Sequence, residues 1–219
     1  MINSSQFILW GSGGHAKVLA DIIYMGRGKI IALFDNNKVS SAIPGVPVFN
    51  GKENFITWIS DRGRNKNEIS GLVAIGGGRG QDRLKIQSLF HEYGITTPVL
   101  RHPSSIVSPS ALLGKGTQVL AFSIIAAESE LGDACIINHR ASVDHECKIG
   151  NGVHIGPSAT LCGRVSVADN VFIGAGAVIL PDISIGKNSI IGAGAVVTKS
   201  ISANSILAGN PARLINIKF

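Results

Sequence analysis

The sequence predicts a protein of two parts, a small α/β part built on a parallel sheet and a parallel β-helix that follows it. Two patterns lead to this expectation. Apolar strands alternate with helical patterns and glycine turns in the N-terminal half, and a six-residue aliphatic period then runs from Val107 to Val197. The composition agrees, because 27 Gly and only 5% aromatic residues favour many short strands joined by turns. We expect domains at residues 1–102 and 103–219.

The first part is predicted to alternate strands with helices. Residues 7–26 open with an apolar strand, turn at glycines, and continue with apolar residues at helical spacing. The stretch "KIIALFD" (29–35) predicts a second strand, and "GLVAIGGG" (71–78) predicts a third that ends in glycines. Residues 81–94 have an amphipathic helical pattern, and residues 96–103 form a last strand or an extended linker. This alternation indicates a small parallel sheet.

The turn after the first strand approximates a Rossmann-like dinucleotide fingerprint. Gly11, Gly13 and Gly14 precede the helix, although Ala16 stands where the last glycine would be, and Asp35 ends the next strand. Such a turn presents backbone N–H groups to a phosphate, while the carboxylate can accept hydrogen bonds from a ribose or a base. The alternative is a glycine turn that serves only strand-to-helix packing.

A second glycine turn strengthens the ligand interpretation. Gly76 and Gly77 follow the third strand, and ligands bind at the carboxyl ends of parallel strands. His15 belongs to the first turn and faces either ligand or solvent. The turn continues as "GGGRGQDR", so either Arg79 or Arg83 is available to meet a diphosphate.

The second part repeats every six residues. Each sixth residue from Val107 to Val197 is Val, Ile or Leu, and the residue two before each is small or β-branched. A hexapeptide period of short strands and turns predicts a parallel β-helix, and the departure from register after Val197 predicts a terminal cap. Seven of the aliphatic residues are followed by a glycine, which we expect to supply freedom in φ at a turn: Gly114, Gly132, Gly150, Gly156, Gly174, Gly186 and Gly192.

One hexad contains ionisable side chains that the packing of a β-helix does not require. His145 stands between Asp144 and Glu146, and His154 follows nine residues on. A histidine has a suitable pKa for removing the proton from an attacking nucleophile, and a carboxylate beside it can orient the ring. Either neighbouring acid can play that part as far as the strand alternation goes. The alternative is an exposed corner histidine with no task.

The motifs "GSGGHAKV", "VAIGGG", "HPSS", "NHRASVDHE" and "GNPAR", together with the hexads, resemble a sugar acyltransferase family over essentially the whole chain. That family includes sialic-acid O-acetyltransferases and N-acetyltransferases of nucleotide-linked 4-amino-4,6-dideoxy sugars. The resemblance implies a left-handed β-helix with eighteen residues per coil. It also implies acetyl-CoA as co-substrate, a nucleotide-linked sugar bound by the first domain, and a homotrimer with active sites between neighbouring chains.

The resemblance also assigns residues. It implies that His145 is the catalytic base with Glu146 as its partner, that His154 contacts the acetyl group, and that Asn138 lies near the sugar. Two further positions are implied to contact coenzyme A, namely Ala175 and Ala193.

The eighteen-residue coil that the resemblance implies adds one more residue. Adding eighteen to 145 gives Gly163, which we expect on the next coil directly beside His145. A glycine there leaves room for a thioester carbonyl and offers an N–H to its oxyanion. The same arithmetic continues to Pro181 and Lys199, and Lys199 is then near the phosphates of the coenzyme.

The remaining composition narrows the function. A net charge of +6, from scattered basic residues without a stacking platform, suits anionic small molecules rather than nucleic acid. Three cysteines without paired spacing predict neither a disulfide nor a zinc finger. No leader and no membrane-spanning run are recognisable, so we expect a cytoplasmic enzyme without a membrane partner.

The predicted activity is an acetyl-CoA-dependent N-acetyltransferase acting on a nucleotide-linked amino-dideoxy sugar for glycan or polysaccharide synthesis. One alternative is O-acetylation of a sialic acid or another sugar hydroxyl, because the base does the same work for both acceptors. A zinc enzyme with His139, His145 and His154 as ligands, and a non-catalytic scaffold, are less favoured. We expect no metal.

Overall fold

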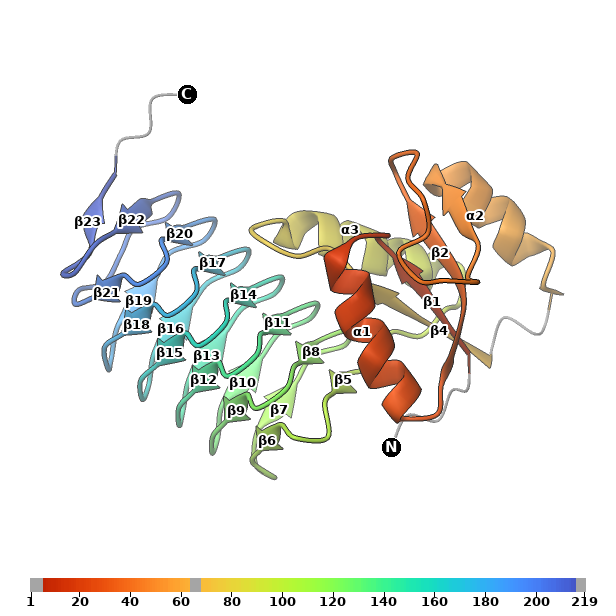
Figure 1. Cartoon of the computed structure of the whole chain (residues 1–219). Coiled ribbons are helices and arrows are strands. Elements are labelled where there is room, and N and C mark those ends of the chain that lie inside the picture. The colour runs from red at the N-terminus through yellow and green to blue at the C-terminus, as the bar shows by residue number, and fades with distance from the viewer. Residues whose placement is uncertain (1–5, 64–67, 216–219) are drawn as a thin grey trace. The chain divides into compact units, whose positions relative to one another are not determined.

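The computed structural model describes residues 6–63 and 68–215, in which the chain forms two compact units (Figure 1). One unit contains the chain as far as Gly76 together with Asp82–Leu100. The other contains Gly77–Gln81 and the chain from Arg101 onward. The short segment Gly77–Gln81 therefore belongs with the second unit, although elements of the first precede and follow it.

The first unit is built on the predicted small parallel sheet. Its four strands are parallel and lie in the order β3-β2-β1-β4, and its helices connect them. The region between Asp35 and Ile69, for which we had no expectation, adds a short edge strand and a helix. The elements are β1 (Gln6–Trp10), α1 (Gly14–Met25), β2 (Lys29–Asp35), β3 (Val48–Asn50), α2 (Gly51–Ser60), β4 (Ile69–Val73) and α3 (Gly80–Glu92).

Aromatic side chains fill the core of this unit. Trp10 lies at the centre, with its ring centroid 5.8 Å from Phe34, 5.6 Å from Phe55 and 6.1 Å from Phe90. These four side chains are fully buried and come from two strands and two helices. Offset and edge-to-face ring pairs of this kind add stability beyond area burial, so β1, which precedes the first glycine turn, is firmly packed.

The second unit is the predicted parallel β-helix. Seventeen two-residue strands follow one another, and in all but the first the second residue is the aliphatic residue of the six-residue period. The strands are β5 (Leu100–Arg101), β6 (Ile106–Val107), β7 (Leu112–Leu113), β8 (Gln118–Val119), β9 (Ile124–Ile125), β10 (Glu130–Leu131), β11 (Ile136–Ile137), β12 (Ser142–Val143), β13 (Lys148–Ile149), β14 (His154–Ile155), β15 (Thr160–Leu161), β16 (Ser166–Val167), β17 (Phe172–Ile173), β18 (Val178–Ile179), β19 (Ser184–Ile185), β20 (Ile190–Ile191) and β21 (Val196–Val197).

Each coil contains eighteen residues and pairs with the next in strict register. Val143 pairs with Leu161, and Leu161 pairs with Ile179, so residues eighteen apart stack directly on one another. The coils thereby form three parallel sheets, one of which contains β6, β9, β12, β15, β18 and β21. We call residues that stack in this way a column.

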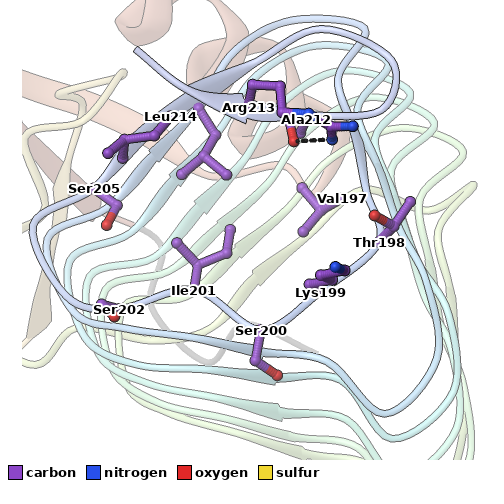
Figure 2. A pocket seen from close by; sticks show the side chains of 11 residues that line it. Val197, Thr198, Lys199, Ser200, Ile201, Ser202, Ser205, Ala212, Arg213 and Leu214 are labelled. Carbon is purple, nitrogen blue, oxygen red and sulfur yellow. Dashed lines mark hydrogen bonds between the residues drawn. The ribbon is translucent and has the colours of Figure 1, made fainter. Parts of the chain in front are cut away.

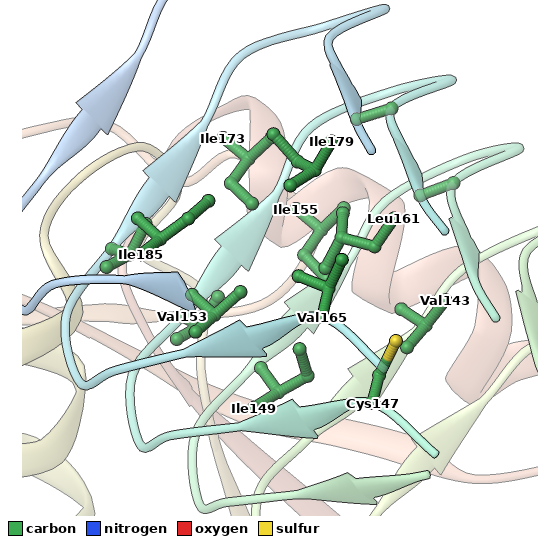
Figure 3. Packing of buried hydrophobic residues seen from close by; sticks show 14 of the residues in the cluster. Val143, Cys147, Ile149, Val153, Ile155, Leu161, Val165, Ile173, Ile179 and Ile185 are labelled. Carbon is green, nitrogen blue, oxygen red and sulfur yellow. The ribbon is translucent and has the colours of Figure 1, made fainter. Parts of the chain in front are cut away.

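The inward residues of every coil form one continuous core. The aliphatic residues of the three sheets meet along the helix axis, as Figure 3 shows for Ile155, Leu161, Ile173 and Ile179 among others. The smaller residues two places earlier, such as Cys147, are buried beside them. Burial raises the pKa of the Cys147 thiol to about 11, which fits a cysteine that serves as a small core residue.

The glycines that follow the aliphatic residues are there for a different reason from the one expected. None of the seven has a positive φ; that conformation occurs two residues later in the corner, for example at Gly152 and Gly176. Instead, a Cβ on Gly174 would stand 2.5 Å from the Ala193 N of the next coil, and the other six meet similarly close atoms. The expectation of φ freedom was wrong, because these glycines are set by the close approach of stacked coils.

The last coil departs from the eighteen-residue register. Ile185 pairs with Ile201 and Ile190 pairs with Ile206, which are sixteen apart. Two closing strands follow, β22 (Ile206–Ala208) and β23 (Arg213–Leu214), and they are antiparallel. The chain thus leaves the register after Val197, as the sequence predicts. The eighteen-residue spacing holds as far as Val197, which pairs with Ile179, and is lost by Ile201, so the place of Lys199 beside Pro181 stays a prediction.

Candidate active site

His145 and Glu146 lie together at one corner of the β-helix, in the turn between β12 and β13. His145 Nδ1 is 2.9 Å from Glu146 Oε2, and the two side chains are 45% and 50% exposed. Glu146 has a φ of 57°, the left-handed conformation that recurs at this place in the corners. Asp144 instead accepts a hydrogen bond from the His145 backbone N–H at 2.7 Å. Of the two neighbouring acids, Glu146 is the one beside the ring.

This pairing fixes the tautomer of the histidine. A carboxylate only accepts hydrogen bonds, so the Nδ1–H of His145 donates to Glu146 and the Nε2 carries the lone pair. The Nε2 atom points toward the next coil, where Gly163 lies. The lone pair is therefore available to a proton donor bound at this corner.

Gly163 lies directly beside the imidazole. An ideal Cβ on Gly163 would stand 2.5 Å from His145 Nε2 and 2.6 Å from Cε1, closer than real side chains approach. The equivalent place in other hexads holds side-chain-bearing residues such as Ala127, Asn151 and Pro157, so the backbone there tolerates a Cβ. Among the described residues, no hydrogen bond uses the Gly163 N–H. The glycine thus provides both space and an unused backbone donor.

His154 is buried on a different face of the β-helix, on β14. Its side chain is 6% exposed and lies edge-on to Phe172 at a centroid distance of 5.2 Å. The Asn138 Nδ2–H donates to His154 Nε2 at 3.1 Å. The proton of the His154 ring is therefore on Nδ1, which donates to the Gly77 carbonyl at 3.3 Å. The structure therefore brings together three predicted residues, Asn138, His154 and Gly77, within the second unit.

The two alanines implied to contact coenzyme A stack on another corner. Ala175 and Ala193 are exposed, and the Gly194 N–H donates to the Ala175 carbonyl. His139 belongs to the same column two coils earlier. Its pKa is lowered, first by burial and then by the nearby His102, so His139 is neutral at this corner near neutral pH.

The glycine turns of the first unit lie at the carboxyl ends of the adjacent strands β1 and β4. Gly11 has a φ of 113°, and a Cβ there would collide with the Ala74 carbonyl. A Cβ on Gly13 or on Gly14 would meet nothing within 4 Å. The N-cap Gly13 makes no side-chain cap, and the Ala16 N–H donates to the Gly13 carbonyl at 3.1 Å. His15, partly buried, is in the first turn of this helix.

Asp35 stabilises the first glycine turn through hydrogen bonds. Its Oδ2 accepts from the Ser12 N–H and its Oδ1 accepts from the Asn37 N–H, both at 2.9 Å. Ser12 in turn accepts from the Ala42 N–H at 2.9 Å, and Asn50 donates to the Asp35 carbonyl at 3.1 Å. Sequence reasoning missed these partners, although "DNN" at the end of a strand is a recognisable turn signal.

The two arginines after the second glycine turn are placed differently. Arg83 is fully buried in α3, and its guanidinium donates to the Ile75 carbonyl at 3.2 Å. Arg79 is exposed. Of the two, Arg79 is the one whose side chain reaches solvent, and it belongs to the second unit with Gly77.

A cavity of 660 Å³ opens at the last coil of the β-helix. Lys199 and Arg213 lie at its edge in Figure 2, and Val197, Ile201 and Leu214 form its apolar wall. It contains none of the residues predicted for catalysis or for nucleotide binding.

Two classes of feature are not found in residues 6–63 and 68–215. No three His, Cys, Asp or Glu side chains are grouped to hold a metal ion. No helix there has the length and apolarity needed to cross a bilayer.

Comparison with known proteins places the chain in a family. The model of the PglD N-terminal domain matches residues 6–88, and the bacterial transferase hexapeptide model matches residues 128–163 and 164–199. No curated protein matches the chain significantly.

Solved structures are similar along nearly the whole chain. PerB from Caulobacter crescentus, in complex with CoA and GDP-perosamine, is 35% identical with a TM-score of 0.87, over 96% of this chain and 97% of that one. The acetyltransferase domain of PglB from Neisseria gonorrhoeae, in complex with acetyl coenzyme A, is 32% identical with a TM-score of 0.86, over 97% and 100%. WeeI from Acinetobacter baumannii is 26% identical with a TM-score of 0.84, over 95% and 99%.

Proposed function

This chain belongs to the hexapeptide-repeat acyltransferases that carry a PglD N-terminal domain, and from that premise we propose that it acetylates the amino group of a nucleotide-linked amino sugar. The observation that carries the proposal is the end-to-end similarity to a protein crystallised with CoA and GDP-perosamine. Structures of histidine variants of GDP-perosamine N-acetyltransferase from the same organism are 34% identical and match over 97% of this chain. The donor is acetyl-CoA.

The chemistry that we assign to the corner follows from the His145 tautomer. The sugar amine attacks the thioester carbonyl carbon, and His145 Nε2 removes the proton that the nitrogen sheds. Glu146 accepts from Nδ1–H and stabilises the imidazolium that forms. The unused Gly163 N–H donates to the developing oxyanion. When the carbon–sulfur bond breaks, the imidazolium returns its proton to the coenzyme A thiolate, and the amide is released.

Nucleotide binding is assigned to the first unit. Gly11, Gly13 and Gly14 are proposed to present the N-terminus of α1 to a diphosphate, and Gly76 follows the adjacent strand β4. An α/β sheet binds nucleotides at the carboxyl ends of two neighbouring parallel strands whose connections run in opposite directions. Asp35 holds the turn in shape through Ser12, and its carboxylate retains capacity to accept from a ribose hydroxyl. We keep residues 1–102 and 103–219 as the proposed nucleotide and transferase domains.

The acetyl donor is assigned to the second unit. His154 and Asn138 are proposed to border the acetyl group and the sugar, and Ala175 and Ala193 to contact coenzyme A through their exposed corner. Small residues at a corner permit a close approach of the pantetheine chain. Gly77, held by His154, is proposed to contact the sugar nucleotide.

A homotrimer is the assembly that we propose. The sheet that contains β6 and β21 carries no charged residue among its outward strand positions, which are Ile106, Ile124, Ser142, Thr160, Val178 and Val196. Ile106 is 64% exposed and Ile124 is 41% exposed in one chain. A second copy that covers this uncharged face would bury them. We place the reaction in the cytoplasm, where acetyl-CoA and nucleotide sugars are made, and in the supply of precursors for a glycan or polysaccharide.

The test is a calorimetric titration of the protein with GDP, UDP, dTDP and CMP, each with and without coenzyme A. We expect one of these nucleotides to bind together with coenzyme A, and the amino sugar linked to that nucleotide to be acetylated. The variant His145→Asn should bind both ligands and lose turnover by at least about a hundredfold. Binding of coenzyme A without any nucleotide would overturn the proposal in favour of a free sugar acceptor, and a fully active His145→Asn would overturn the mechanism.

A further inference from the structure

Charged residues of alternating sign form a column at the same corner as the proposed base. Glu146, Arg164 and Asp182 occupy the same place in three successive coils, and their φ angles are 57°, 60° and 60°. Backbone hydrogen bonds hold these corners in register, because the Arg164 N–H donates to the His145 carbonyl and the Asp182 N–H donates to the Gly163 carbonyl. The cation therefore lies one coil from each carboxylate.

Arg164 binds only one of the two acids. Its Nε donates to Asp182 Oδ1 at 2.7 Å and its Nη2 donates to Asp182 Oδ2 at 2.9 Å, which is the bidentate geometry of the strongest guanidinium–carboxylate pairs. Glu146 keeps its Oε2 for His145 Nδ1. Glu146 and Asp182 thus each have a partner of their own.

The charges of the column also influence one another. Hydrogen bonding to Arg164 holds the pKa of the Asp182 carboxyl below its ordinary value, so this acid is ionised over the whole range of a neutral assay. The pKa of Arg164 is raised, chiefly by Asp182 and to a smaller extent by the charge of Glu146. Glu146 is therefore within electrostatic reach of the guanidinium, although it is not bonded to it.

We propose that Asp182 is a positioning residue for acetyl transfer, because it holds Arg164 away from Glu146 and so reserves that carboxylate for His145. This inference rests on the proposed function. Without Asp182, the remaining carboxylate whose charge acts on the freed guanidinium is that of Glu146, one coil away. A guanidinium bound there competes with His145 Nδ1 for the same oxygen. It also brings a positive charge beside the ring at the moment when the imidazolium forms, which disfavours that charge.

The experiment is a double-mutant cycle on the purified full-length protein with acetyl-CoA and its amino-sugar acceptor. Asp182→Asn keeps the shape of the side chain and removes its charge, and it should lower kcat roughly tenfold with both KM values within about twofold. Adding Arg164→Gln to that variant removes the competing cation and should restore kcat to within about threefold of the wild type. Arg164→Gln alone completes the cycle.

Two controls separate the inference from simpler explanations. Glu128 stands in the same column one coil before Glu146, so Glu128→Gln removes a charge at matched spacing and should leave kcat within about twofold. Thermal unfolding of each variant reports whether the corner stays folded, and a fold defect would not be rescued by the second substitution.

The outcomes distinguish the inference from the function on which it rests. An Asp182→Asn variant with wild-type kcat, or a double variant no faster than Asp182→Asn, would overturn the positioning role while wild-type transfer persists. Absence of acetyl transfer by the wild-type protein would overturn the proposed function, and the positioning role with it.

Discussion

The substitution Gly163→Ala tests the geometry of the proposed active site most directly. The added Cβ would stand 2.5 Å from His145 Nε2, whereas unstrained contacts between such atoms lie at about 3.5 Å. The imidazole must therefore withdraw by about 1 Å, and a displacement of that size at a reacting group costs about a hundredfold in rate. The His145 ring is 45% exposed, so it has room to move away from the coil.

The effect on stability should be much smaller than the effect on rate. Gly163 does not have a positive φ, and other hexads carry side chains at its place, so the backbone accepts an alanine. Because the crowded ring can move toward solvent, we expect the free energy of unfolding to fall by about 1 kcal/mol, the low end of the range for overpacking. Catalysis and stability should thus separate.

The measurement is the rate of coenzyme A release under saturating substrates, together with urea unfolding. The matched control is Gly163→Ala made in a His145→Ala background, where the crowded ring is absent and the free energy of unfolding should be unchanged. A Gly163→Ala protein with kcat within about twofold of the wild type would refute the assignment of this glycine to the active site. An equal loss of stability in both backgrounds would refute the crowding argument.

Two further predictions concern the β-helix itself. Gly174→Ala should lower the free energy of unfolding by about 1–3 kcal/mol, because the added Cβ would stand 2.5 Å from the Ala193 N of the next coil. Urea unfolding measures this change, and an unchanged midpoint would contradict the stacking account. Cys147 has a pKa raised from 9.0 to about 11, so between these pH values the folded protein retains a proton that the unfolded chain has lost. The free energy of unfolding should accordingly decline as pH rises from 9 to 11, and it should decline less in Cys147→Ala. If the urea midpoints of the two proteins fall with the same slope against pH, the thiol does not contribute.

Several features of the proposed sites depend on contacts between residues that are distant in the sequence. His154 binds the Gly77 carbonyl across 77 positions of sequence, and Asp35 reaches back to Ser12 across 23. Arg83, which the sequence left open as a diphosphate ligand, is buried with its guanidinium on the Ile75 carbonyl. Strand β3 and helix α2 were not expected, although Phe55 and Ile59 have the spacing of one helical face.

The sequence by itself determined the β-helix and much of the corner that we propose as the active site. A coil of constant length converts spacing in sequence into spacing in three dimensions, so adding eighteen to His145 identifies Gly163 as its neighbour without any structure. The tertiary structure decided what that arithmetic does not contain. The left-handed backbone of the corner selects Glu146 rather than Asp144 for the ring, and the pairing of Arg164 with Asp182 depends on side-chain geometry between coils. Periodicity fixes which residues are neighbours, whereas rotamers and corner dihedrals fix which neighbours bond.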